Sequence, residues 1–150
     1  MITNRTQYDI DTAIDIIKEK VQKFEELTES DIESLERGTI TINTLNRIEN
    51  KQEELKNLFN EMGYWNTDIT NKLWDYTQVF NVDEFRRILD NTNVLREAFF
   101  VYSHTPNTPP ISYHYNDINA LEKILNDLDV MINNIKSNYK ICGVAICENL

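Results

Sequence analysis

Two histidines and two cysteines are the side chains of this sequence best suited to hold a metal ion. His104 and His114 flank a proline-rich segment, and Cys142 and Cys147 form a Cys-x4-Cys pair. Structural zinc sites use closely spaced cysteine pairs together with histidines that lie near one another on a helix. The wide separation of the two histidines argues against zinc. We therefore expect solvated loop histidines, no metal site and no cofactor.

Covalent and acid–base catalysis are the next chemistries to consider. A cysteine nucleophile needs an electropositive pocket beside a histidine, whereas both cysteines lie in an apolar run of an acidic chain. Neighbouring carboxylates such as Asp83 and Glu84 point about 100° apart on a helix, which predicts solvated faces and not a catalytic pair. The isolated glycines Gly38, Gly63 and Gly143 form no phosphate-binding loop. We expect a protein that is not an enzyme.

The composition limits the fold classes and the kinds of partner that we expect. With 150 residues, 41% hydrophobic and 27% charged, the chain has the material for one globular domain. Only 3 glycines and 3 prolines leave few tight turns, which favours helices over sandwiches and barrels. The net charge of −10 repels phosphates and anionic headgroups, so we expect no nucleic-acid and no membrane partner. The expected absence of an export signal and of a membrane span predicts assembly in the cytoplasm.

Apolar spacing predicts an all-α fold, a small bundle of about four to five helices. A first stripe runs from Ile10 to Phe24, and Ser30 with Glu33 has the spacing of a capping box for a short helix that ends at a left-handed Gly38. The segment 39–42 alternates like a strand and is expected to be an extended link. The following helices are predicted to start at the N-caps Asn43, Asn81 and a residue near Asn116, with Gly63 closing the first of them and a proline-rich loop at 103–110 preceding the last.

The last helix has the most regular apolar stripe, with steps of three and four residues. This stripe is wide enough for either a bundle interior or a coiled coil with other chains. We predict that its residues form an interface: Ile118, Leu121, Leu125, Leu128, Ile132 and Ile135. The aromatic residues Trp65, Trp74, Phe99 and Phe100 are expected in the core, with an interface role as the alternative.

The carboxyl-terminal segment has a different character. It is a short β-prone run of low charge that would favour aggregation if left in water. We therefore divide the chain into a helical domain, 1–138, and an apolar C-terminal docking tail, 139–150. The predicted interface residues of this tail are Tyr139, Ile141, Val144 and Ile146.

The order of segments resembles a known family. Residues 2–6, the string Gly38-Thr39-Ile40-Thr41-Ile42-Asn43-Thr44-Leu45-Asn46-Arg47-Ile48-Glu49, and the segments 81–99 and 115–125 are similar to structural modules in tail, baseplate and tail-fibre proteins of phages and phage-tail-like particles of Gram-positive bacteria. The family often ends in an aromatic, glycine-containing segment, whereas residues 141–147 of this chain are largely aliphatic.

The resemblance implies a structural virion component without catalysis, at the baseplate or at the attachment of a receptor-binding fibre. Its implied partners are other tail, baseplate or fibre proteins and further copies of itself within a particle that assembles in the host cytoplasm. The charge suggests an alternative, a cytoplasmic acidic regulator or inhibitor that binds a basic host protein. Against this alternative, lysines interrupt the acidic residues, while a phosphate mimic needs unneutralised rows of carboxylates.

Overall fold

The chain is all-helical, as its composition predicts. The structure, a computed structural model, describes the backbone of residues 1–64, 67–112 and 114–147 and the side chains of these ranges as far as residue 138. Within these ranges there are five α-helices and no strand. The helices are α1 (Gln7–Glu19), α2 (Glu29–Gly38), α3 (Ile42–Glu61), α4 (Val82–Glu97) and α5 (Tyr115–Cys147), with a 3₁₀ turn, η1 (Val21–Lys23), after α1.

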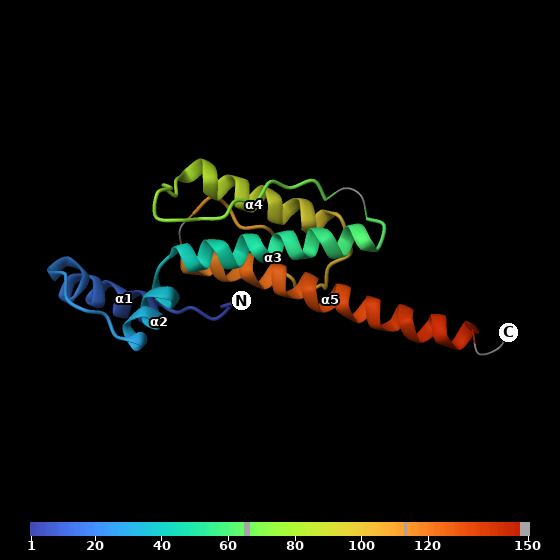
Figure 1. The fold of residues 1–150 in the computed structure, drawn as a ribbon, viewed down its shortest axis with the longest axis horizontal. Coiled ribbons are helices and arrows are strands. Elements are labelled where there is room, and N and C mark those ends of the chain that lie inside the picture. The colour runs from blue at the N-terminus through green and yellow to red at the C-terminus, as the bar shows by residue number, and fades with distance from the viewer. Residues whose placement is uncertain (65–66, 113, 148–150) are drawn as a thin grey trace.

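Helices α1 and α2 form a hairpin beside the other three helices (Figure 1). Each helix starts with a capping box, in which a threonine side chain and an acidic side chain three residues later each accept from the other's backbone N–H. The pairs are Thr6 with Asp9 and Thr28 with Asp31. The predicted box of Ser30 and Glu33 is therefore wrong, because α2 already begins at Glu29 and Ser30 lies in its first turn.

The turn between the two helices differs from the predicted continuous stripe. Helix α1 ends at Glu19, and Phe24 takes a left-handed conformation with φ of 57° and a side chain that is 97% exposed. A left-handed residue is uncommon outside glycine, asparagine and aspartate, so this phenylalanine carries local strain. Its backbone is held by N–H bonds from Phe24 to Val21 and from Glu25 to Lys20, which redirect the chain towards α2.

Gly38 is the last residue of α2, and its role differs from the predicted left-handed cap. A Cβ atom at this position would overlap the carbonyl oxygen of Asp9 and the side chain of Ala13, so glycine allows α1 and α2 to approach closely. After a short link, Thr41 and not Asn43 is the N-cap of α3. Two other predicted helix signals are confirmed: Asn81 caps α4, and Gly63 follows α3 with φ of 85°.

Helices α3, α4 and α5 form a bundle in which all three run in the same direction (Figure 1). Two ion pairs show the common direction of α3 and α5. Arg47 pairs with Glu122 near the start of both helices, and Glu61 pairs with Lys136 further along both. The contacts between α3 and α4 also run in parallel, since Glu49 pairs with Arg87 and, further along, Phe59 lies against Phe99 just after α4. Antiparallel neighbours are joined by short loops, whereas parallel neighbours need connections that return along the bundle.

The two long connections serve this purpose and are fastened to the helices by polar side chains. In the first, Asn46 of α3 exchanges two hydrogen bonds with the backbone of Trp74, at 2.7 and 3.0 Å. In the proline-containing second connection, the buried hydroxyl of Thr105 donates to Asp127 of α5. These bonds replace the strand or helix partners that an extended segment lacks.

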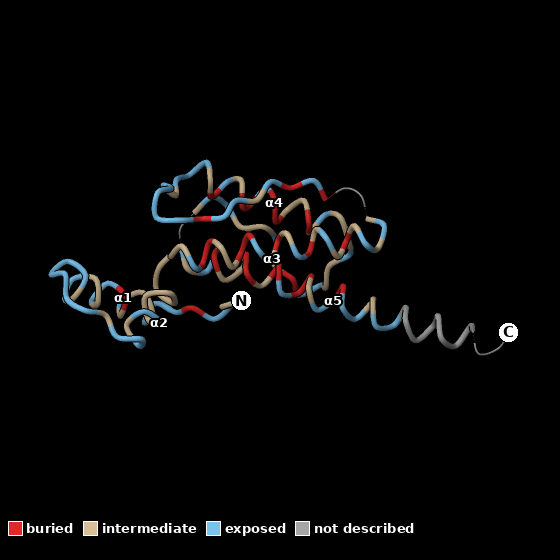
Figure 2. The backbone as a smooth tube through the Cα atoms, viewed as in Figure 1, coloured by how far each residue is buried: buried red, intermediate tan, exposed pale blue. Residues whose placement is uncertain are grey.

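The core lies between the three bundle helices, where buried positions follow each helix (Figure 2). Its largest side chains have exposed fractions close to zero, which excludes water from the bundle interior. They are Leu55 and Phe59 of α3, Phe85, Ile88 and Leu95 of α4, and Leu121, Ile124, Leu125, Leu128 and Ile132 of α5.

Candidate assembly interface

Five of the predicted interface residues lie inside the chain's own core. Ile118, Leu121, Leu125, Leu128 and Ile132 are at most 3% exposed and pack against α3 and α4. Of the two arrangements that the stripe allowed, the structure therefore shows the bundle interior for these residues. Their assignment to contacts with other chains is corrected, because the parallel partners α3 and α4 already cover this face of α5.

The rest of the predicted interface lies towards the end of α5. Ile135 is half-buried at the margin of the core. The side chains of Tyr139, Ile141, Val144 and Ile146 lie outside those that the structure describes, so their docking role stays a prediction. The backbone of α5 is helical as far as Cys147, through most of the predicted docking tail.

Helix α5 is much longer than its bundle partners. It has 33 residues, and α3 has 20 residues. At about 1.5 Å per residue, these helices extend roughly 50 Å and roughly 30 Å. The two helices start near the same end of the bundle, so α5 continues past the end of α3 (Figure 1). Among the described side chains, the ion pair of Glu61 with Lys136 joins the two helices just before the predicted docking tail begins.

Sequence reasoning missed a second set of apolar groups, in the connection between α3 and α4. Leu73, Tyr76 and Val79 are 74%, 95% and 78% exposed, although they flank residues that pack inward. Trp74 is buried, and its ring lies 5.7 Å from that of Phe80. The sequence does contain a signal that could have distinguished the exposed from the inward-facing residues. Leu73 is followed by Trp74 and Val79 by Phe80, and such alternation is typical of an extended segment with one covered face.

The four aromatic residues expected in the core have different positions. Trp74 is buried, and Phe99 packs half-buried against Tyr64, with ring centroids 4.7 Å apart. Phe100 is 83% exposed, so its expected place in the core is wrong. It follows the end of α4, and its neighbours Phe99 and Val101 pack against the core in its place. Trp65 lies outside the described residues.

A buried carboxylate on α5 joins the amino-terminal segment to the bundle. Glu122 is fully buried, and its Oε1 accepts from Nε and Nη2 of Arg47 at 3.0 and 2.8 Å. Its Oε2 accepts from the backbone N–H of Ile2 at 2.8 Å and from Nη1 of Arg5 at 2.7 Å. Next to it, Asn119 exchanges hydrogen bonds with the backbone of Arg5. Both oxygens of this carboxylate are occupied by donors from the amino-terminal segment and α3, which makes it a structural clamp.

A second buried carboxylate, on α3, holds the α3–α4 connection and α4. Glu49 is 1% exposed and accepts from Nε1 of Trp74 at 2.6 Å and from the backbone N–H of Lys72 at 2.6 Å. Arg87 of α4 donates to both of its oxygens, at 2.6 and 2.9 Å. The hydrogen bond to Glu49 raises the pKa of Arg87 above its ordinary value. No local spacing predicts either clamp, because the partners are far apart in sequence.

The candidate metal and thiol residues are not brought together in the described part of the chain. The ring of His104 stacks on Tyr102 at 5.2 Å and lies 3.9 Å from Asp127, while Nδ1 of His114 accepts from the backbone N–H of Asn116. Among described residues, no group of three or more histidine, cysteine and acidic side chains is placed to hold a metal ion. The side chains of Cys142 and Cys147 lie outside the described set.

Hydropathy adds one further observation on the helices. Within the part of the chain that the structure describes, no helix has both the length and the apolar character needed to cross a membrane. We also compared the chain with models of protein families, with curated proteins and with solved structures, and none of the three comparisons gave a match.

Proposed function

We propose that this protein is a structural component of a phage tail or contractile phage-tail-like particle, at the baseplate or at the attachment of a receptor-binding fibre. Its role would be subunit–subunit assembly, with other tail proteins and further copies of itself as partners, inside the host cytoplasm. The proposal starts from the resemblance of the segments 38–49, 81–99 and 115–125 to tail proteins. It names no catalytic residue and no cofactor.

The observation that carries the proposal is the length of α5 relative to the bundle. The first five stripe residues are covered by α3 and α4, and the helix then continues past the end of α3 into the apolar segment 139–147. A segment of such composition lowers its free energy by burial against another protein, at about 25 cal/mol per Å² of apolar surface. The bundle thus supplies a rigid base, and the end of α5 supplies the contact.

The exposed apolar residues of the α3–α4 connection give the proposal further support. Leu73, Tyr76 and Val79 present large side chains on a connection that is itself fastened by Trp74 and Asn46. Exposed apolar groups on a fixed backbone lose little conformational entropy when they become buried in an interface. These residues form a second candidate contact of the assembled particle.

The regulator alternative receives less support from the charges. A mimic of nucleic acid presents unpaired carboxylates to its target. In this chain Asp9, Asp31, Glu49, Glu84 and Glu122 each pair with a basic side chain. Many of the acidic groups therefore already have cationic partners within the fold.

Incorporation into particles tests the proposal. We would express tagged full-length chain, a chain lacking residues 139–150, and a triple variant Ile141→Ser, Val144→Ser, Ile146→Ser, in cells that produce the particle, and then purify particles and measure the tagged chain in them. We expect the full chain to be incorporated and both variants to be lost from particles at least tenfold. The matched control is Ile14→Ser, since Ile14 is an exposed apolar residue on α1.

Circular dichroism of the purified variants distinguishes a lost contact from a lost fold, because all core residues among the described side chains precede residue 139. Failure of the full-length chain to enter any tail particle would overturn the proposed role. Unchanged incorporation of both variants would overturn the docking role of the segment 139–147. Co-elution of the full chain with a basic host enzyme, and not with tail proteins, would favour the regulator.

A further inference from the structure

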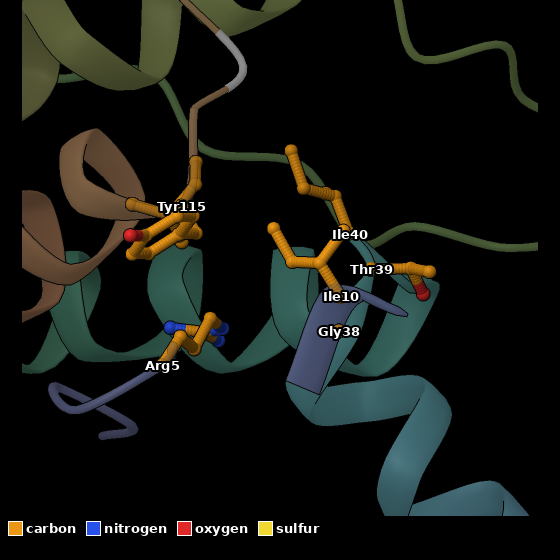
Figure 3. Close-up of a pocket in the computed structure, with 7 residues that line it drawn as sticks. Arg5, Ile10, Gly38, Thr39, Ile40 and Tyr115 are labelled. Atoms are coloured by element: carbon orange, nitrogen blue, oxygen red, sulfur yellow. The ribbon is translucent and has the colours of Figure 1, made fainter. Parts of the chain in front are cut away.

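A pocket lies where the α1–α2 hairpin meets the bundle (Figure 3). Its lining comes from the amino-terminal segment, from both hairpin helices, from the link to α3 and from the first turn of α5, with a cavity volume of about 240 Å³. Figure 3 shows Arg5 and Tyr115 on one side and Ile10 and Ile40 on the other. The pocket is mostly apolar, with one guanidinium in its lining.

That guanidinium is incompletely bonded. Nη1 of Arg5 donates to the carbonyl of Ile2 at 2.6 Å, to Glu122 at 2.7 Å and to Asn119 at 3.4 Å. Nη2 is buried and has no acceptor among the described residues, the one side-chain nitrogen or oxygen in this state. Buried donors in folded proteins nearly always have a partner, so this nitrogen can still donate to a hydrogen-bond partner from outside the protein chain.

The local charge favours a negatively charged acceptor. Two guanidinium groups, those of Arg5 and Arg47, share the single carboxylate of Glu122. Tyr115 and Ile118 of the pocket lie in the first turn of α5. The positive end of the helix dipole there adds to this excess, and Asp117 in the same turn offsets part of the addition. The chain's net charge of −10 acts at longer range. Its field is screened beyond about 8 Å at physiological salt.

We propose that this pocket binds a small apolar monocarboxylate. The carboxylate accepts from Nη2 of Arg5, and the apolar part of the ligand packs against Ile10, Ile40 and Ile118. The ligand is compact, because the cavity is smaller than the pockets that hold drug-sized molecules. Nη2 is covered in the unliganded fold, so we expect the Arg5 side chain to rotate towards the cavity when the ligand binds. This role is separate from the assembly function.

Three probes of nearly the same size and different charge test the ligand class. We would titrate the isotope-labelled full chain with benzoate, benzyl alcohol and benzylamine at fixed pH and ionic strength, and follow backbone and methyl signals by NMR. Benzoate is expected to give saturable shifts at Arg5, Ile40 and Ile118. Benzyl alcohol is expected to bind at least tenfold more weakly, and benzylamine not to shift these signals. Equal binding of benzylamine, or no saturable shift with benzoate, would overturn the proposal.

Two variants locate the site. Ile40→Trp fills the cavity from its rim, and its matched control is Ile32→Trp at an exposed position of α2 outside the lining. We expect benzoate to bind at least tenfold more weakly to the first variant and unchanged to the control. Arg5→Lys keeps a cation beside Glu122 and removes Nη2, so it should weaken benzoate at least tenfold and leave benzyl alcohol unchanged. Wild-type benzoate affinity in both site variants would overturn the assignment, even if one of them folds poorly.

Discussion

The hairpin and the bundle of this small protein are stabilised by different interactions. Within residues 7–41, all of which the structure describes, Ala13 is the one buried residue, and the helices are joined by ion pairs such as Asp9 with Arg37 and Lys20 with Asp31. The bundle instead buries large aliphatic and aromatic side chains from three helices. Apolar burial contributes more per residue than exposed ion pairs, so we expect the hairpin to open at a lower free energy than the bundle.

The charged groups of the two regions also have different roles. In the hairpin, the paired charged groups lie nearer the surface and all belong to the hairpin itself, as in Asp9 with Arg37 and Lys20 with Asp31. In the bundle, Glu49 and Glu122 are buried and connect segments far apart in sequence. A buried pair stabilises little relative to apolar packing but is costly to break, because the remaining charge is left without a partner. The buried clamps therefore fix which segments meet.

The largest difference in stability is expected when a phenylalanine is replaced by alanine in each of the two regions. Phe59 is a fully buried ring of the bundle, and Phe24 lies at the exposed turn of the hairpin. Phe59→Ala should lower the free energy of unfolding by about 3–5 kcal/mol. Phe24→Ala should change it by at most about 0.5 kcal/mol. Urea denaturation followed by circular dichroism measures both values. Similar losses for the two variants would contradict the division into two differently stabilised regions.

Loss of one buried charge should have the next largest effect. Glu122→Gln leaves Arg5 and Arg47 without a carboxylate, which should cost about 3 kcal/mol. Hydrogen exchange should also rise at Ile2 and Arg5, whose N–H groups are held by this clamp and its neighbour Asn119. The matched control is Glu61→Gln, since Glu61 forms an exposed pair with Lys136. Such a pair should contribute at most about 1 kcal/mol. Equal effects of the two substitutions would show that burial of Glu122 is not what matters.

Gly38→Ala should lower stability less than the two changes above, and its effect should be confined to the hairpin. The added methyl group overlaps Asp9 and Ala13, so α1 and α2 must move apart at a cost of about 1–3 kcal/mol. Hydrogen exchange measured by mass spectrometry should increase in peptides from α1 and α2, with bundle peptides unchanged. Glu33→Ala, on the exposed face of α2, is the control. Protection in the hairpin equal to that of the wild type would contradict the close-packing role of Gly38.

Acid should weaken the hairpin through its capping carboxylates, which is the smallest of the four effects. Hydrogen bonds from Arg37 lower the pKa of Asp9 to about 2, and hydrogen bonds from Lys20 and Thr28 lower that of Asp31 to about 2. Since both values are depressed by folding, their stabilisation is present above the unfolded pKa near 4 and is lost as the pH falls towards 2.

NMR signals of α1 and α2 between pH 5 and 2 measure this loss. The double variant Asp9→Asn, Asp31→Asn is the control, and its hairpin should respond less to pH in this window because the two titrating groups are gone. A wild-type hairpin whose signals are independent of pH across the window would contradict the role of the two capping carboxylates.

The fold was predictable from sequence where the signals are local. Asn81, Gly63 and the spacing of the α5 stripe act over one or two helical turns, and the structure confirms them. The buried partners of Glu49 and Glu122 leave no comparable trace, because Arg5 and Glu122 are 117 residues apart. The parallel direction of the helices was also missed, although long connections on both sides of α4 are a signal for it.

The predicted interface was wrong for the apolar stripe of α5 as far as Ile132, because the identity of the partner helix is also not a local signal. A stripe with coiled-coil spacing has the same pattern whether its partner is another chain or the same chain. Here α3 and α4 occupy the stripe as far as Ile132. The exposure of Leu73 and Tyr76 was not predicted either, because it depends on which side of the α3–α4 connection faces the bundle. Sequence alone predicts which residues are apolar, while the topology determines which of them remain accessible.

The common direction of α3, α4 and α5 gives the bundle an electrical axis. In an up-and-down arrangement neighbouring helix dipoles largely cancel, whereas three parallel ones add, with partial positive charge at the end where the helices begin and partial negative charge where they finish. Acidic side chains follow the starts of two of these helices, at Asp83 and Asp117, and compensate part of this field. A body with such an axis has two electrostatically unlike ends, so the two ends of the bundle offer different surroundings to a charged group that approaches them.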